Sequence, residues 1–191
     1  MISRPSKNEL AAADAMIWIY NHDRESQYYS CCRKVRNMIA GGEFKGNIAL
    51  QTATEIAGAI SNPRNYRHPK TNIDFSSALS IVTDIIKTPN LRLILPTASS
   101  LPTAIDFCRK YNLKRKQWYD AVLAATLLNN GIHVLYTMND KDFLPITELS
   151  LINPFTETLR AGSIPVEWSA QPSEISPKAS GDKPADDGMN E

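Results

Sequence analysis

Apolar residues recur with two different periods along this chain, and these periods predict alternating helices and strands. From Asp120, apolar residues fall three, four, seven and eight positions further on, which places them on one face of a helix. Asn130 and Gly131 follow, a pair that is typical of a helix end. The next stretch, 132–136, is almost wholly apolar, as in a parallel strand that is covered on both faces.

The same patterns recur through the rest of the chain and predict an α/β fold. Short apolar runs predict further strands at 10–13, 46–50, 91–95 and 151–152. Amphipathic stretches predict helical segments at 15–20, 27–40, 51–60, 75–87 and 103–111. This alternation is typical of a sheet with helices on both faces. We therefore expect a three-layer α/β/α domain with a mainly parallel sheet of four or five strands.

Length and local composition predict one folded domain with a terminal extension. A chain of 191 residues has the size of a single domain. We assign residues 1–9 to a flexible N-terminus and residues 10–158 to the folded domain. Residues 161–191 are rich in Pro, Ser, Asp and Gly, and this composition predicts a disordered tail.

Charge is balanced over the whole chain but is unevenly distributed. The net charge is +1, yet residues 161–191 hold six acids and two bases, a net charge of −4. Residues 1–160 therefore hold 19 bases and 14 acids, a net charge of +5. A mildly basic body is compatible with a polyanionic partner.

The cysteines and the apolar runs indicate in which cellular compartment we expect the protein. The three cysteines show no spacing that is typical of a zinc site or a disulfide framework. A reducing cytoplasm is the simplest compartment for such a chain. No apolar run is long enough to span a membrane, so we expect no membrane association through a spanning helix.

Several acidic residues stand where ligand sites form in parallel sheets. Asp14 directly follows the first predicted strand, and Asp142 lies shortly after the strand at 132–136. Asp120 lies on the apolar face of its helix, where a carboxylate is costly to bury without a cation or hydrogen-bond donors. Carboxylates that share a pocket repel one another, and hard cations such as Mg²⁺ or Mn²⁺ relieve this repulsion. These residues are candidate metal ligands.

Glu55 has two interpretations. Thr52 to Glu55 has the pattern of a capping box, in which Glu55 reaches back to the start of its helix. This spacing alone favours the capping role. Taken together with the other three acids, Glu55 is better explained as a fourth candidate ligand after the second strand.

Further polar residues are candidates for contacts around these acids or with a nucleic acid. Thr137, Asn139 and Asp140 follow the strand at 132–136 and are candidates for hydrogen bonds to the ligand carboxylates or to the substrate. Arg64 and Arg67 stand in a basic loop, which is a phosphate-binding segment or a solvated surface loop.

Bases and aromatic residues are also interleaved just before Asp120. Arg115 and Lys116 lie among Tyr111, Trp118 and Tyr119. Such a mixture binds single-stranded RNA by phosphate contacts and stacking. Alternatively, the aromatic side chains pack in the core and the bases face water. The sequence does not separate the two interpretations.

Two motifs in fixed order resemble a known family. D-A-V-L-A-A-T at 120–126, then a short apolar strand, then T-x-N-x-x-D-F at 137–143 resemble the C-terminal half of PIN-domain nucleases. The most similar subgroup is the VapC-type toxins of bacterial toxin–antitoxin pairs. Asp14 and Glu55 match the family's acids after the first and second strands. The resemblance spans about residues 10–155.

This resemblance implies a function. It implies a metal-dependent endoribonuclease in which Asp14, Glu55, Asp120 and Asp142 hold Mg²⁺ or Mn²⁺, and the ion activates water to cleave RNA phosphodiester bonds. It also implies a cognate antitoxin protein and a homodimer.

Two alternatives stay open. The same enzyme could serve housekeeping RNA processing, which the absence of a neighbouring antitoxin gene would indicate. A degenerate PIN domain could instead bind RNA or protein without cleavage. Ala15 and Met16 point to this second alternative, because the family usually has small polar residues there. The presence of all four acids favours the nuclease.

Overall fold

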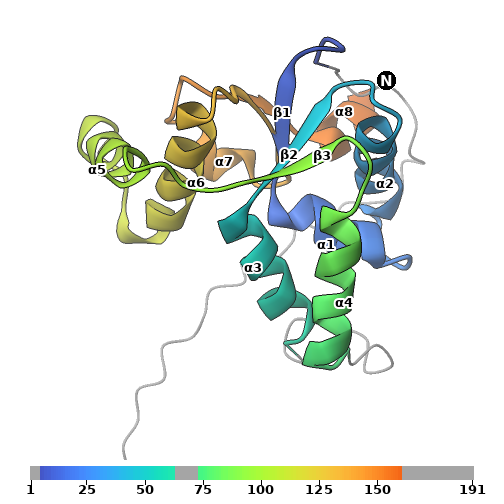
Figure 1. Ribbon diagram of the computed structural model, residues 1–191. Coiled ribbons are helices and arrows are strands. Elements are labelled where there is room, and N and C mark those ends of the chain that lie inside the picture. The colour runs from blue at the N-terminus through green and yellow to red at the C-terminus, as the bar shows by residue number, and fades with distance from the viewer. Residues whose placement is uncertain (1–4, 63–72, 161–191) are drawn as a thin grey trace, which may run out of the picture.

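The chain folds into a five-stranded parallel sheet with helices on both faces (Figure 1). The computed structural model describes residues 5–62 and 73–160. The strands are β1 (Leu10–Ala13), β2 (Lys45–Ala49), β3 (Leu91–Ile94), β4 (Val134–Tyr136) and β5 (Ser150–Ile152). The helices are α1 (Ala15–His22), α2 (Tyr29–Ala40), α3 (Leu50–Ile60), α4 (Phe75–Ile86), α5 (Ser100–Lys110), the 3₁₀ turn η1 (Arg115–Gln117), α6 (Trp118–Asn129), α7 (Asp140–Phe143) and α8 (Pro154–Arg160).

This architecture confirms the predicted three-layer α/β/α fold, with five strands. Two predictions fall outside the described residues: the disordered tail 161–191, and the phosphate-binding role of Arg64 and Arg67. Among the described helices, none has both the length and the apolar character needed to cross a bilayer.

The strand order creates a crevice at one end of the sheet. The order is β3-β2-β1-β4-β5, and every neighbouring pair is parallel. The chain therefore builds outward from β1 in one direction through β2 and β3, and then crosses to the other side of β1 to form β4 and β5. Ligands of open α/β sheets bind at such a reversal, beyond the carboxyl ends of the strands. Here the reversal lies between β1 and β4.

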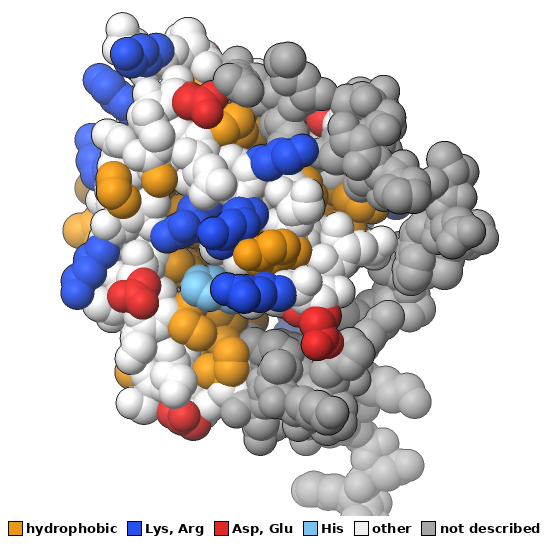
Figure 2. Space-filling model, turned by 90° about the vertical axis from the view of Figure 1, so that its right-hand side faces the viewer, with side chains coloured by type: hydrophobic (Ala, Val, Ile, Leu, Met, Phe, Trp, Pro, Cys, Tyr) orange, Lys and Arg blue, Asp and Glu red, His pale blue; other side chains and the backbone are white. Residues whose placement is uncertain are grey.

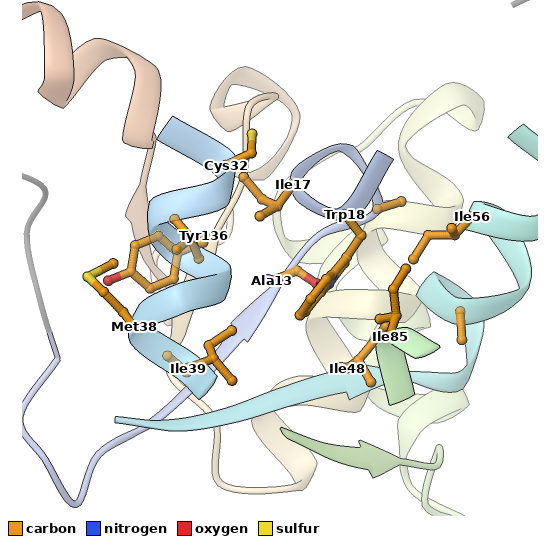
Figure 3. Packing of buried hydrophobic residues seen from close by; sticks show 14 of the residues in the cluster. Ala13, Ile17, Trp18, Cys32, Met38, Ile39, Ile48, Ile56, Ile85 and Tyr136 are labelled. Atoms are coloured by element: carbon orange, nitrogen blue, oxygen red, sulfur yellow. The ribbon is translucent and has the colours of Figure 1, made fainter. Parts of the chain in front are cut away.

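Trp18 is central to the core on one face of the sheet. Helices α1, α2, α3 and α4 supply this core, and Trp18 is 0% exposed within it (Figure 3). Its ring lies near Ile48 and Ile85, from β2 and α4 (Figure 3). The indole Nε1 donates a hydrogen bond to the carbonyl oxygen of Ala13 at 3.2 Å. Trp18 thereby ties α1 to the end of β1.

The opposite face of the sheet is covered by α5, α6 and α7. Their buried side chains, which include Leu127 and Phe143, pack against Ala12 and Leu135 of the central strands. At the end of α6, Gly131 has a φ of 72°, the left-handed conformation that glycine adopts without strain. The predicted helix end is thus confirmed.

The structure excludes the alternative interpretation of Glu55 as part of a capping box. Helix α3 begins at Leu50, directly after β2, and its N-cap is Ala49. Glu55 therefore lies in the second turn, and Thr52 is buried inside the helix. The reason is that β2 passes into α3 without a loop. The helix therefore begins at Leu50, before the Thr52 to Glu55 segment that the capping-box pattern places at a helix start.

Candidate functional site

Asp14 lies at the reversal of the strand order and is buried, with an exposed fraction of 9%. It caps α1, and its Oδ1 accepts a hydrogen bond from the backbone N–H of Ala15 at 2.7 Å. Its Oδ2 accepts a hydrogen bond from the hydroxyl of Thr137, beyond β4, at 2.9 Å. Burial raises the pKa of Asp14, while these two hydrogen bonds act in the opposite direction.

The hydrogen bonds continue from Thr137 to a second acid. The backbone N–H of Asn139 donates to the hydroxyl oxygen of Thr137 at 3.0 Å. The side-chain amide of Asn139 donates to Oδ2 of Asp142 at 2.6 Å. Thr137 and Asn139 therefore orient Asp14 and Asp142 as parts of one network. Asp140 begins α7, and no hydrogen bond found within 5–62 and 73–160 joins its carboxylate to this network.

If Asp14 holds Mn²⁺, as its place among the other acids suggests, Thr137→Val should weaken Mn²⁺ binding by about 10- to 100-fold, the usual effect of removing a partner that orients a ligand. The substitution keeps the side-chain shape but removes the donor to Asp14, so the pKa of Asp14 should rise further. Titration calorimetry measures the affinity. Thr126→Val is the matched control, because Thr126 is also buried but donates to the carbonyl of Val122 in α6. Equal affinities for both variants would contradict the role of Thr137.

Asp120 and Glu55 approach the same site from two helices. Asp120 lies in the first turn of α6 and is half-buried. Burial, then the charges of Asp142, Asp14 and Glu55, raise the pKa of Asp120 to about 7. Partial burial, then the charge of Asp14, raises the pKa of Glu55. The structure thus brings all four sequence-predicted acids within electrostatic reach of one another.

These raised pKa values predict how the stability of the metal-free protein depends on pH. Between about 3.8 and about 7, folded Asp120 retains a proton that the unfolded chain has lost. The free energy of unfolding should therefore fall as the pH rises through this range, because the folded state binds more protons. Asp120→Asn should stabilise the protein at pH 8 by about 1–2 kcal/mol, a figure that allows for screening by water.

Urea unfolding in EDTA at pH 4 to 8 measures this dependence. The difference between wild type and Asp120→Asn isolates the contribution of Asp120 from those of other titrating groups. Asp106→Asn is the control, because Asp106 is an exposed acid on α5 that does not line the site. A wild-type curve that runs parallel to the Asp120→Asn curve would contradict the prediction.

Asp14, Glu55 and Asp120 line a hollow of about 620 Å³ that is open to solvent, whereas Asp142 reaches it only through its hydrogen bond with Asn139. Its lining residues are Asp14, Met16, Gln51, Thr54, Glu55, Tyr119, Asp120, Leu123 and Asn139. Gln51 and Thr54 belong to no motif that the sequence shows, so only the structure places them at the hollow. A signal for Gln51 was available, since it lies four positions before Glu55 and thus on the same side of α3.

The chemistry of this site fits a hard divalent cation. Carboxylate oxygens are the donors that Mg²⁺ and Mn²⁺ prefer. Within residues 5–62 and 73–160, no three His, Cys, Asp or Glu side chains form a group that is arranged to hold a metal ion. Mg²⁺ usually takes one or two protein carboxylates and fills its other positions with water and phosphate. A pair of these acids is therefore sufficient.

The structure separates the aromatic residues that precede Asp120. Tyr111 and Trp118 are partly buried and pack against the core beneath α5 and α6. Tyr119 is 70% exposed and lines the hollow. Arg115 and Lys116 are exposed on η1, shortly before Trp118 and Tyr119. Core packing is thus the correct interpretation for Tyr111 and Trp118. Tyr119 is exposed, as the interpretation of a stacking residue requires.

Cations also gather away from the hollow. Figure 2 shows Lys and Arg side chains across the middle of one face of the molecule, among few acids. On α2, Arg33 and Lys34 are exposed, and no residue of α2 lines the hollow. These cations give the domain positive charge at a second place, apart from the hollow.

Solved structures share this fold. VapBC2 from Rickettsia felis, bound to a DNA fragment from its promoter, is 13% identical, and the match covers 75% of this chain and 99% of that chain with a TM-score of 0.53. VapBC-1 from nontypeable Haemophilus influenzae is 15% identical, with coverage of 76% and 98% and a TM-score of 0.52. PAE2754 from Pyrobaculum aerophilum is 15% identical, with coverage of 82% and 97% and a TM-score of 0.50.

No protein-family model matches the sequence, and no curated protein matches it either. At such low identities the structural likeness shows the fold. It confirms the three-layer α/β/α fold, and it extends over nearly the full length of each matched chain.

Proposed function

We propose that this protein is a Mg²⁺- or Mn²⁺-dependent endoribonuclease that acts as the toxin of a toxin–antitoxin pair. The observation that carries the proposal is the convergence of Asp14, Glu55, Asp120 and Asp142 at the reversal of the strand order. Four carboxylates from four separate segments repel one another, and the fold alone gives no reason to assemble them. A cation-binding site for phosphodiester chemistry gives that reason.

In this proposal each residue has a definite task. Thr137 and the N–H of Ala15 hold the carboxylate of Asp14 in one orientation. Asn139 holds Asp142 in the same way. Asp120 on α6 and Glu55 on α3 are the further oxygen donors that line the hollow. When bound, Mg²⁺ or Mn²⁺ lowers the pKa of a water molecule and neutralises charge on the scissile phosphate.

The basic residues of the domain suit a nucleic acid as the substrate. Arg115 and Lys116 are exposed on the turn that leads into α6, and α6 carries Asp120. The body of the chain, residues 1–160, has a net charge of +5. Phosphate contacts from such cations position a nucleic acid without fixing its sequence.

The toxin role rests on the fold and the motifs together. The sequence motifs resemble VapC-type toxins, and two of the similar structures are VapBC proteins. A cognate antitoxin, a homodimer and a cytoplasmic location belong to the same proposal. Growth arrest on expression that is relieved by the product of a small neighbouring gene would support the toxin role. Harmless expression would favour housekeeping RNA processing.

Ala15 does not support the alternative of a degenerate domain that binds without cleavage. Ala15 supplies its backbone N–H to Asp14, and the hydroxyl donor comes from Thr137 in another strand-end segment. A small polar side chain at position 15 is therefore not required to satisfy Asp14.

We expect RNA cleavage by the purified protein to require Mn²⁺ or Mg²⁺ and to disappear in EDTA, because the crowded acids need a cation to approach a phosphate. Gel analysis of a labelled single-stranded RNA measures the cut. Re-addition of the metal in excess of EDTA must restore it, which excludes irreversible loss of the protein. Cleavage that persists in EDTA would refute the proposed mechanism, and binding without cleavage would favour the scaffold.

A further inference from the structure

Tyr119 is the most exposed large apolar or aromatic side chain among the described residues. It is 70% exposed, whereas its neighbour Trp118 packs against the core. A large ring facing solvent carries no benefit for folding, since its apolar surface is left in contact with water. Its position beside Asp120 on the wall of the hollow places this ring where a substrate would lie.

The backbone that carries Tyr119 is held in place. The side-chain amide of Gln51, on α3, donates a hydrogen bond to the carbonyl oxygen of Tyr119 at 3.0 Å. The turn before α6 is closed by a hydrogen bond from the backbone N–H of Lys114 to Oε1 of Gln117 at 3.0 Å. An aromatic side chain on such a fixed backbone loses little conformational entropy when a ligand stacks on it.

The surroundings of the ring fit a nucleotide in two respects. Exposed cations on η1, Arg115 and Lys116, are suited to phosphates. The carboxylates on the floor of the hollow are suited to the scissile phosphate once a cation is bound. A base next to that phosphate has the ring of Tyr119 as its available aromatic surface, because Leu123 and Met16 are the apolar groups among the other lining residues.

We propose that Tyr119 is a specificity-determining residue that stacks on an unpaired nucleobase beside the scissile phosphate. The inference rests on the proposed nuclease function and deepens it. Bases inside a duplex are already stacked on both faces, and an aromatic side chain reaches only a base that is splayed out.

The decisive test compares cleavage of one RNA as a single strand and as a duplex. Wild type should prefer the single strand. Tyr119→Ala should raise the KM for the single strand by about 5- to 100-fold, in line with the contribution of base–aromatic stacking. Its kcat should stay nearly unchanged. Because the KM rises for the single strand and not for the duplex, the preference for the single strand is lost. Tyr119→Phe keeps the ring and should restore the wild-type KM. Phe75→Ala is the control, since Phe75 is 58% exposed but does not line the hollow.

A second readout does not depend on cleavage. A single-stranded oligoribonucleotide that carries the fluorescent base 2-aminopurine beside the cut should be quenched on binding to wild type and to Tyr119→Phe, but not on binding to Tyr119→Ala. Equal KM values, or equal quenching, for wild type and Tyr119→Ala would overturn the inference. If wild type fails to cleave, the proposed function fails, and the quenching still decides whether Tyr119 stacks on a base. No quenching by wild type would overturn the stacking itself.

Discussion

Asp120→Asn should reduce metal-dependent RNA cleavage by at least about 10³-fold, which corresponds to about 4 kcal/mol of lost transition-state stabilisation. In the proposed mechanism Asp120 is a charged oxygen donor to the metal, and its carboxylate interacts with the charges of Asp142, Asp14 and Glu55. Asparagine keeps the size of the side chain but not its charge, so the site attracts a cation less strongly. Initial rates at saturating Mn²⁺, over a range of RNA concentrations, separate the effect on kcat from that on KM.

Two controls make this result specific. Asp106→Asn changes an exposed acid on α5 in the same way and should cleave like wild type. In EDTA at pH 8, Asp120→Asn should be more stable than wild type, because it removes a carboxylate that is repelled by its neighbours. With this stability result, a loss of cleavage by Asp120→Asn would not reflect unfolding of the variant. Cleavage by Asp120→Asn within tenfold of wild type would exclude Asp120 from the catalytic site.

Trp18→Ala should lower the free energy of unfolding by about 3–5 kcal/mol, the range for truncating a fully buried large aromatic residue. The indole ring is 0% exposed in the core formed with α2, α3 and α4, and its removal leaves a cavity (Figure 3). The hydrogen bond from Nε1 to the carbonyl of Ala13 is lost as well. Because domains of this size are stable by only about 5–15 kcal/mol, this variant should lie close to the limit of folding.

Urea denaturation measures the change. Trp18→Phe should cost less, because most of the apolar volume remains and mainly the hydrogen bond is lost. Phe75→Ala removes an exposed ring and should change stability by no more than about 0.5 kcal/mol. A loss below about 1 kcal/mol for Trp18→Ala would contradict its central place in the core.

The effect of Trp18 on stability extends to the site. Ala13, which accepts its hydrogen bond, directly precedes Asp14. The backbone N–H of Asp14 in turn donates to the carbonyl of Tyr136 at 2.9 Å, which joins the ends of β1 and β4. The position of the buried acid therefore depends on the packing of the core beneath it. Variants that loosen this core should impair the site even when they retain all four acids.

Much of the site was accessible from the sequence because it depends on local patterns. The apolar period from Asp120 identified α6 and placed this acid in its first turn, where the structure has it. Asp14 was recognised because it directly follows an apolar strand, and that strand, β1, has the predicted bounds. Periodicity reflects the geometry of a single element, and this geometry does not change with the rest of the fold.

Other features depend on how the elements meet. The hydrogen bond from Thr137 to Asp14 joins residues 123 positions apart, and it exists because β4 lies beside β1. The early start of α3, which removed Glu55 from a capping position, follows from the direct passage of β2 into the helix. Of Trp118 and Tyr119, adjacent in sequence, the structure packs the first, partly buried, against the core and exposes the second.

The sequence by itself therefore determined the strands, most of the helices, the fold class and the identity of the candidate acids, but not the short helices α7 and α8. Only the tertiary structure decided that these acids meet at the reversal between β1 and β4, and that Tyr119 faces the hollow beside them. The physical reason is that helices and strands arise from interactions between residues close in sequence. A site arises from the order of the strands, which long-range packing selects.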